Sequence, residues 1–339
     1  MFLKGSHFIS IDQITSATDL ETIFSLAFKL ELFSSRKKTT RILEGAVLAN
    51  LFFEPSTRTR FSFGTAFTLL GGNVQEITGT DSTSISKGES IFDTSRVISG
   101  YVDIMVVRHP DIQALAKFAN ASKIPVINAG NGIGEHPSQA LLDIYTIVKE
   151  FGNGQLANLR NLSICMVGDL KHGRTVHSLA KLLSIIGGIR FNLISPPALK
   201  MPHHIIKLLE QRNNDVVETD NFKTGVRDSN VIYLTRIQKE RFENPDDFLK
   251  YAGSYNLDLD FYEQFCSSEP IIMHPLPRDS SLKKPEISED LNFHPKLMIF
   301  KQSDNGIPVR MALFALILGL TEQQIFAASQ DVPWHYTFS

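Results

Sequence analysis

One short segment combines three hydroxyl side chains with two arginines: Ser56, Thr57, Arg58, Thr59 and Arg60. A helix should begin here, because Pro55 stops the apolar run 46–53 and Ser56 or Thr57 can act as its N-cap. Free backbone N–H groups, hydroxyls and guanidinium groups at a helix N-terminus bind a multiply charged oxyanion, most simply a phosphate. A cap alone needs only one hydroxyl, so the segment favours a phosphate site over an ordinary capped helix.

More cationic and polar side chains follow apolar runs that are typical of strands. They are Arg108 after residues 104–107, His136 and Gln139 after 124–128, Arg174 after 163–167, and Arg236 and Gln238 after 231–234. Open α/β sheets bind their ligands at the carboxyl ends of the strands, so these side chains are expected to face substrates. Solvated arginines and a capping histidine are the simpler alternatives.

Together with Ser56, Thr57, Arg58 and Thr59, these side chains include four arginines but no carboxylate, and no Ser–His–Asp order or nucleophilic cysteine accompanies them. The ligands should therefore be anionic, and catalysis should rely on positioning and electrostatics without a covalent intermediate. Because one cluster lies in each half of the chain, we expect two anionic substrates.

The elements that must position these residues alternate between apolar runs and helical patterns, which predicts parallel sheets with helices on both faces. Further strands are expected at residues 73–77, 190–194 and 271–273, and helices at 16–32, 136–151, 175–186 and 309–320. A chain of 339 residues favours two domains. We expect an α/β protein with two domains, residues 1–150 plus about 300–339 and residues 151–299, and an active site in the cleft between them.

Composition excludes several classes of function. The formal net charge of −2 gives no reason to expect nucleic-acid binding. No apolar stretch reaches membrane-spanning length. The N-terminus lacks the apolar core of a signal peptide, and Cys165 and Cys266 lie within apolar runs, which indicates a reducing, cytoplasmic location. HExxH and paired CxxC motifs are absent, so neither a metal nor a cofactor is expected.

Six segments, taken together, resemble the motifs of the aspartate carbamoyltransferase family, in its catalytic chain. They cover nearly the whole chain in the family's order, which is highly specific although each segment alone is only moderately so. The segments are Phe53-Glu54-Pro55-Ser56-Thr57-Arg58-Thr59-Arg60, Arg108-His109-Pro110, His136-Pro137-Ser138-Gln139, Gly168-Asp169-Leu170-Lys171-His172-Gly173-Arg174-Thr175, Thr235-Arg236-Ile237-Gln238-Lys239-Glu240-Arg241 and His274-Pro275-Leu276-Pro277-Arg278.

The resemblance implies transfer of a carbamoyl group from carbamoyl phosphate to L-aspartate, the committed step of pyrimidine synthesis, without a cofactor. It implies three groups of residues. Ser56, Thr57, Arg58, Thr59 and Arg108 would hold the phosphate, His136 the carbonyl oxygen, and Gln139 with the Pro275 and Leu276 carbonyls the amino group; Arg174, Arg236 and Gln238 would bind aspartate. Arg58, Thr59, Arg108 and His136 would act in catalysis.

The resemblance also implies a homotrimer in which a loop serine and lysine enter the neighbouring subunit's site. Ser84 and Lys87 are the candidates, with Lys87 also contacting aspartate and Thr83 as an alternative to Ser84. Whether regulatory chains or a dihydroorotase bind is left open. Asp304 and Pro308 depart from the family pattern near the last helix, and the tail after Leu320 lies outside the resemblance.

Three alternatives remain. Ornithine carbamoyltransferase shares the fold and the phosphate substrate, but ornithine is a cation and its site favours an acidic partner and a cysteine where this chain has Leu276. A non-catalytic homologue would keep the same fold without turnover. A nicotinamide dehydrogenase is disfavoured, because Gly168 and Gly173 do not form a GxGxxG motif.

Overall fold

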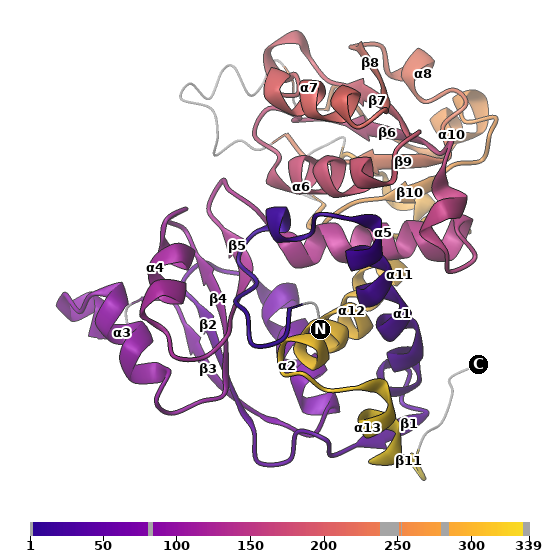
Figure 1. Ribbon diagram of the computed structural model, residues 1–339. Helices are drawn as coiled ribbons and strands as arrows, with labels where there is room; N and C mark the ends of the chain where they lie inside the picture. Colours follow the sequence, from indigo (N-terminus) through magenta and orange to yellow (C-terminus); the bar gives the residue numbers. More distant parts are fainter. Residues whose placement is uncertain (1–2, 81–83, 238–250, 252, 279–284, 335–339) are drawn as a thin grey trace. The chain divides into compact units, whose positions relative to one another are not determined.

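The computed structural model describes residues 3–80, 84–237, 251, 253–278 and 285–334 (Figure 1). The chain forms two compact units, which we call unit 1 (Met1–Tyr145 with Asn305–Ser339) and unit 2 (Thr146–Asp304). The chain passes from unit 1 into unit 2 within helix α5 (Pro137–Phe151).

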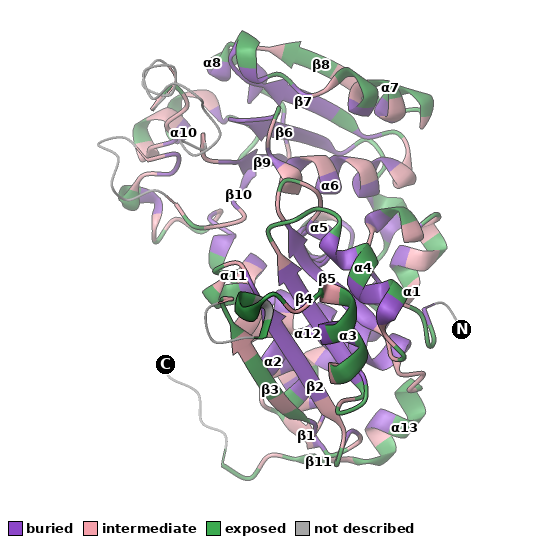
Figure 2. Cartoon of the chain, turned by 90° about the vertical axis from the view of Figure 1, so that its left-hand side faces the viewer, coloured by how far each residue is buried: buried purple, intermediate pink, exposed green. Residues whose placement is uncertain are grey.

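Unit 1 contains a four-stranded sheet in which all strands are parallel. Its spatial order is β3 (Asn73–Thr78), β2 (Val47–Phe52), β4 (Ile104–His109) and β5 (Val126–Asn131). The inner strands β2 and β4 are almost entirely buried, whereas the edge strand β3 is largely exposed (Figure 2). Parallel pairing aligns the carboxyl ends of all four strands along one edge of the sheet.

Helices cover both faces of this sheet (Figure 1). One layer consists of α1 (Ala17–Ser34), α2 (Thr57–Leu69) and α12 (Gly306–Ile317), and the other of α3 (Ile91–Ile98) and α4 (Ala114–Ala121). The centroids of the Phe63 and Phe67 rings on α2 lie 5.9 and 5.0 Å from that of Phe314 on α12. Aromatic packing therefore joins the last long helix of the chain to the helix that carries the hydroxyl and arginine segment.

Unit 2 contains a second wholly parallel sheet. Its spatial order is β10 (Ile271–Met273), β9 (Val231–Leu234), β6 (Ser163–Val167), β7 (Arg190–Ile194) and β8 (Asp215–Thr219). The helices of this unit are α6 (Arg174–Leu183), α7 (His203–Gln211), α8 (Phe222–Gly225), α10 (Leu259–Phe265) and α11 (Ile299–Asp304). The predicted α/β class, with two domains of parallel sheet flanked by helices, is confirmed.

The structure accounts for two features near the C-terminus: Pro308 and the tail after Leu320. Helix α12 begins at Gly306, so Pro308 lies in its first turn, where a missing N–H breaks no intrahelical hydrogen bond. The tail after Leu320 forms α13 (Glu322–Ala327) and β11 (Ser329–Asp331). Strand β11 pairs antiparallel with β1 (Lys38–Thr40), so the tail is an integral part of unit 1.

No helix in the described part of the chain is long and apolar enough to cross a membrane.

Candidate active site

The hydroxyl and arginine segment opens α2, as the sequence predicts. Ser56 occupies the N-cap position, but its side chain makes no capping hydrogen bond. Thr57 and Arg58 are exposed, whereas Thr59, the third residue of the helix, is buried. Arg60 differs from Arg58, because its Nε lies 3.7 Å from Oε2 of Glu76 on β3. We therefore interpret Arg60 as a structural residue that links α2 to β3, and we retain Arg58 as the candidate ligand-binding arginine.

Arg108 lies inside β4 rather than after it, because the strand continues to His109. It stands opposite Phe52 of β2, and its carbonyl accepts a hydrogen bond of 2.9 Å from the Phe53 N–H. Its buried guanidinium lies 3.3 Å, Nε to Oε2, from Glu54 and donates to the Ala129 carbonyl at 3.2 Å. A carboxylate and a backbone carbonyl thus orient this arginine at the carboxyl edge of the sheet.

His136 and Gln139 flank the start of α5, as expected. Nε2 of buried His136 lies 3.4 Å from Oγ1 of Thr59, so the first turns of α2 and α5 meet there. Gln139 donates from Nε2 to Oδ1 of Asp143 at 2.9 Å. Asp143 was not among the predicted site residues, although its spacing of four from Gln139 on a helix places the two on one face.

Gly130 explains how Arg108 and His136 can lie so close. A Cβ atom at this position would come within 2.9 Å of Nη1 of Arg108 and 3.6 Å of Cδ2 of His136. The residue also has a φ of +115°, which L side chains rarely adopt. In unit 1 the structure therefore brings Thr59, Arg108 and His136 together at the ends of β2, β4 and β5.

In unit 2 the arginines stand at the carboxyl edge of the second sheet. Arg174 is the first residue of α6, and Arg236 follows β9 by two residues; both are half-buried. The loop before Arg174 is braced by buried Asp169, which accepts from the Lys171 and His172 N–H groups at 3.2 and 2.9 Å. These hydrogen bonds fix the backbone at the start of α6, and therefore the position from which the Arg174 side chain extends.

The loop after β10 carries the two carbonyl groups expected in the site. His274 is buried, and its N–H donates to Oε1 of Gln302 at 3.0 Å. Nδ1 of His274 in turn accepts a hydrogen bond of 2.9 Å from the Leu276 N–H. The imidazole therefore holds the backbone of Pro275 and Leu276, which lies outside any helix. The loop was expected to be extended, but Leu276 adopts a left-handed backbone with a φ of +57°.

The remaining predicted residues lie on exposed or undescribed segments. Ser84 and Lys87 are exposed at the two ends of the short 3-10 helix η2 (Ser84–Lys87). Thr83 and Gln238 lie outside the described residues. Among the described residues, no group of three or more His, Cys, Asp or Glu side chains could hold a metal ion.

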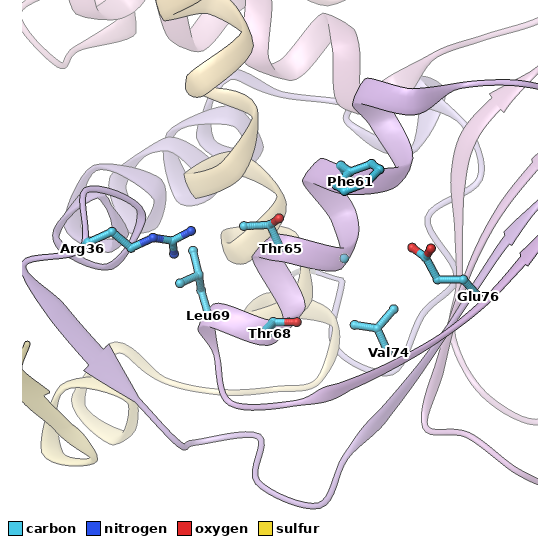
Figure 3. A pocket seen from close by; sticks show the side chains of 8 residues that line it. Arg36, Phe61, Thr65, Thr68, Leu69, Val74 and Glu76 are labelled. Atoms are coloured by element: carbon cyan, nitrogen blue, oxygen red, sulfur yellow. The ribbon is translucent and has the colours of Figure 1, made fainter. Parts of the chain in front are cut away.

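A groove along α2 has a different lining from this site (Figure 3). Its lining comes from the segment after α1, from α2 and from β3, and consists of Arg36, Phe61, Gly64, Thr65, Thr68, Leu69, Val74 and Glu76. None of the predicted site residues lines it. With one arginine against one glutamate, it lacks the excess of positive charge that two anionic substrates require.

The fold and these side chains define a two-domain α/β protein with arginine and polar side chains at the carboxyl edge of the sheet in each domain. Two family models match the chain: the aspartate/ornithine carbamoyltransferase carbamoyl-P binding domain over residues 6–149 and the Asp/Orn binding domain over residues 160–317. The chain therefore belongs to the aspartate/ornithine carbamoyltransferase family.

Individual relatives agree with this family. The chain is 49% identical to the aspartate carbamoyltransferase catalytic subunit of Cellvibrio japonicus, over 98% of each chain. It resembles the solved catalytic subunit of M. jannaschii aspartate transcarbamoylase, with 43% identity, a TM-score of 0.83 and coverage of 93% and 98%. It also resembles Trypanosoma cruzi aspartate transcarbamoylase in complex with carbamoyl phosphate and aspartate, with 35% identity, a TM-score of 0.84 and coverage of 93% and 98%. The resemblance to aspartate carbamoyltransferase noted in the sequence is confirmed.

Proposed function

We propose that this chain is an aspartate carbamoyltransferase catalytic subunit, which converts carbamoyl phosphate and L-aspartate into N-carbamoyl-L-aspartate and phosphate for pyrimidine synthesis. The observation that carries the proposal is the meeting of Thr59, Arg108 and His136 at the carboxyl edge of the unit 1 sheet. Three donor side chains from three separate segments are directed to one place, which is what stabilising a developing oxyanion requires.

In this proposal unit 1 binds carbamoyl phosphate. The phosphate lies at the N-terminus of α2, where backbone N–H groups and the helix dipole favour an anion. The side chains of Ser56, Thr57, Arg58, Thr59 and Arg108 hold its oxygens. His136 donates to the carbonyl oxygen, and Gln139 with the Pro275 and Leu276 carbonyls binds the amino group.

The chemical step is a direct transfer. The lone pair of the aspartate amine forms a C–N bond to the carbonyl carbon, and negative charge grows on the carbonyl oxygen, where Thr59, Arg108 and His136 receive it. The C–O bond to phosphate then breaks, its electron pair leaves with the phosphate, and Arg58 stabilises that charge. The phosphate takes the amine proton, so the atoms and charges balance without a cofactor or a covalent enzyme intermediate.

Unit 2 binds aspartate in this proposal. Arg174 and Arg236, with Gln238, pair with the two carboxylates, since a guanidinium can bind a carboxylate through two parallel hydrogen bonds. The same arginines argue against ornithine, whose side chain is a cation. The test is initial-rate measurement with carbamoyl phosphate and either amino acid: formation of citrulline from ornithine, but no N-carbamoyl-aspartate from aspartate, would overturn the assignment.

We also propose a cytoplasmic homotrimer in which exposed Ser84 and Lys87 complete the site of a neighbouring subunit. Regulatory chains or a dihydroorotase could join such a trimer, and native mass measurement of the purified complex identifies them.

The trimer itself can be tested by mixing Arg58→Ala and Lys87→Ala chains after dissociation. Random mixing makes about three-quarters of closed C₃ rings mixed, each with one intact site, so about a quarter of all sites should recover. Persistent inactivity after confirmed reassembly would remove Lys87 from a shared site.

A further inference from the structure

Arg310 is a buried charge in a helix that is otherwise apolar. It lies on α12, where 11 of the 12 residues are buried, and only 3% of its own surface is exposed. Burial lowers its pKa to about 10, against the opposing effect of nearby Asp143, so it remains a cation at neutral pH. A buried cation costs several kcal/mol unless its partners are well placed, so its contacts need an explanation.

These contacts join two helices of unit 1. Nη1 donates to Oγ of Ser62 on α2 at 2.8 Å, and Nη2 donates to Oγ of Ser138 on α5 at 3.3 Å. The guanidinium carbon lies 4.8 Å from the centre of the Phe63 ring. The space for the guanidinium depends on Gly306, because a Cβ there would lie 2.2 Å from Nη1.

The two serines that Arg310 binds lie beside the candidate site. Ser62 stands one helical turn after Arg58 and Thr59, and Ser138 lies between His136 and Gln139. The guanidinium thus binds both of the helices whose N-terminal ends meet where Oγ1 of Thr59 lies 3.4 Å from Nε2 of His136. Asp143, which opposes the Arg310 charge, also accepts from Gln139.

We propose that Arg310 is a positioning residue of the carbamoyl phosphate site: its two-pronged guanidinium holds the second turn of α2 to the first turn of α5, and through Asp143 it orients Gln139. It does not touch the reacting atoms. Lysine cannot replace it, because a single ammonium does not reproduce the planar fork that reaches both serines. This inference rests on the proposed function, since it concerns how the phosphate half of that site is built.

The test compares Arg310→Met and Arg310→Lys with a matched control, Arg212→Met. Arg212 in unit 2 also donates to two oxygens, the Lys181 carbonyl at 2.8 Å and Oγ of Ser184 at 3.1 Å. Each full-length variant is titrated with inorganic phosphate by calorimetry, and kcat and KM for both substrates are measured below the melting temperature. Circular dichroism confirms that each variant is folded.

Both Arg310 variants should bind phosphate about tenfold or more weakly and lose kcat/KM for carbamoyl phosphate to match, because displacement of about 1 Å can cost about 10² in rate. The KM for aspartate at saturating carbamoyl phosphate should stay within about threefold of wild type. Arg212→Met should lower only the melting temperature and leave phosphate affinity and kcat/KM unchanged. Folded Arg310→Met with phosphate affinity equal to that of Arg212→Met, or full recovery in Arg310→Lys, would overturn the proposal.

A milder pair covers the case in which Arg310→Met does not fold. Ser138→Ala removes one partner of the fork, and Ser95→Ala removes an equally buried serine whose hydroxyl donates to the Phe118 carbonyl at 2.7 Å. Ser138→Ala should weaken phosphate binding about fivefold, as loss of about 1 kcal/mol implies, while Ser95→Ala should not. Equal affinities would contradict the role of Arg310. Phosphate binding without carbamoyl transfer in the wild type would refute the proposed function, and the phosphate titrations would still decide the positioning role.

Discussion

Gly130 keeps Arg108 and His136 close at the end of the unit 1 sheet, and Gly130→Ala should reveal how finely Arg108 is placed. The new Cβ would lie 2.9 Å from Nη1 of Arg108, closer than such contacts occur, but 3.6 Å from Cδ2 of His136, which is ordinary contact. The arginine must therefore move while the histidine can stay. The substitution changes no charge and removes no hydrogen-bonding group.

The size of the effect follows from these distances. Ordinary contact requires the guanidinium to retreat by about half an ångström, and displacement of about 1 Å can cost about 10² in rate, so we expect kcat/KM for carbamoyl phosphate to fall about tenfold. Stability should also fall, by about 1–3 kcal/mol, because an alanine would have to adopt the left-handed backbone that Gly130 uses.

Gly45→Ala provides the control for backbone strain. Gly45 has a φ of +88°, and a Cβ there would meet nothing within 4 Å. Both variants should melt at lower temperature, but only Gly130→Ala should lose catalytic efficiency in initial-rate assays and affinity for inorganic phosphate in calorimetry. If a folded Gly130→Ala enzyme matches Gly45→Ala within twofold in both measurements, Arg108 does not act from the position described here.

Three further outcomes are expected. Arg58→Ala should lower kcat by about 10²–10³, since it removes a preorganised cation from the leaving phosphate, and near-normal kcat would refute its role. Arg236→Ala should weaken the binding of aspartate by about 1.5–3 kcal/mol, while calorimetry should show unchanged binding of carbamoyl phosphate. An equal loss of affinity for both substrates would contradict two separate half-sites. At Asp19, which caps α1, partial burial raises the carboxyl pKa, but hydrogen bonds from Thr15 and Ser16 outweigh burial and hold that pKa below its ordinary value. Its stabilisation is therefore present above about pH 4 and lost on acidification, so the melting-temperature gap between wild type and Asp19→Asn should shrink below that pH; a constant gap would refute this.

The sequence predicts a strand well where both of its faces are buried. Strands β6, β7, β9 and β10 have the bounds expected from their apolar runs. Strand β8 was missed, because the edge segment Asp215–Thr219 contains only exposed and half-buried residues and no long apolar run. The strand β11 was missed for a different reason: Ser329–Asp331 is polar and gains its partner β1 from nearly 300 residues earlier in the chain.

Candidate site residues can be proposed from the sequence where chemistry is concentrated in a short segment, but contacts made across the fold are missed. The segment 56–59 and the residues His136 and Gln139 were proposed from their types and spacing, and the structure brings Thr59 and His136 within 3.4 Å. Glu54 beside Arg108 depends on the pairing of β2 with β4, which single-sequence patterns do not specify. Arg310 carries a usable signal, since one arginine in an apolar helix must be buried with partners, but the sequence does not name those partners.

The surroundings of three unit 1 arginines predict different roles for them. Arg310 is deeply buried near Asp143, and a cation so placed is held by its neighbours and serves the structure. Arg108 is buried with Glu54 at 3.3 Å, so an arriving phosphate competes with that carboxylate for the same guanidinium. Arg58 is exposed, although its surroundings partly desolvate the guanidinium and lower its pKa. In the proposed function, phosphate binding therefore displaces water at Arg58 and competes with Glu54 at Arg108, while Arg310 keeps its contacts. We expect such a site to gain most of its affinity from the exposed arginine and the helix N-terminus, and most of its geometry from the buried arginines.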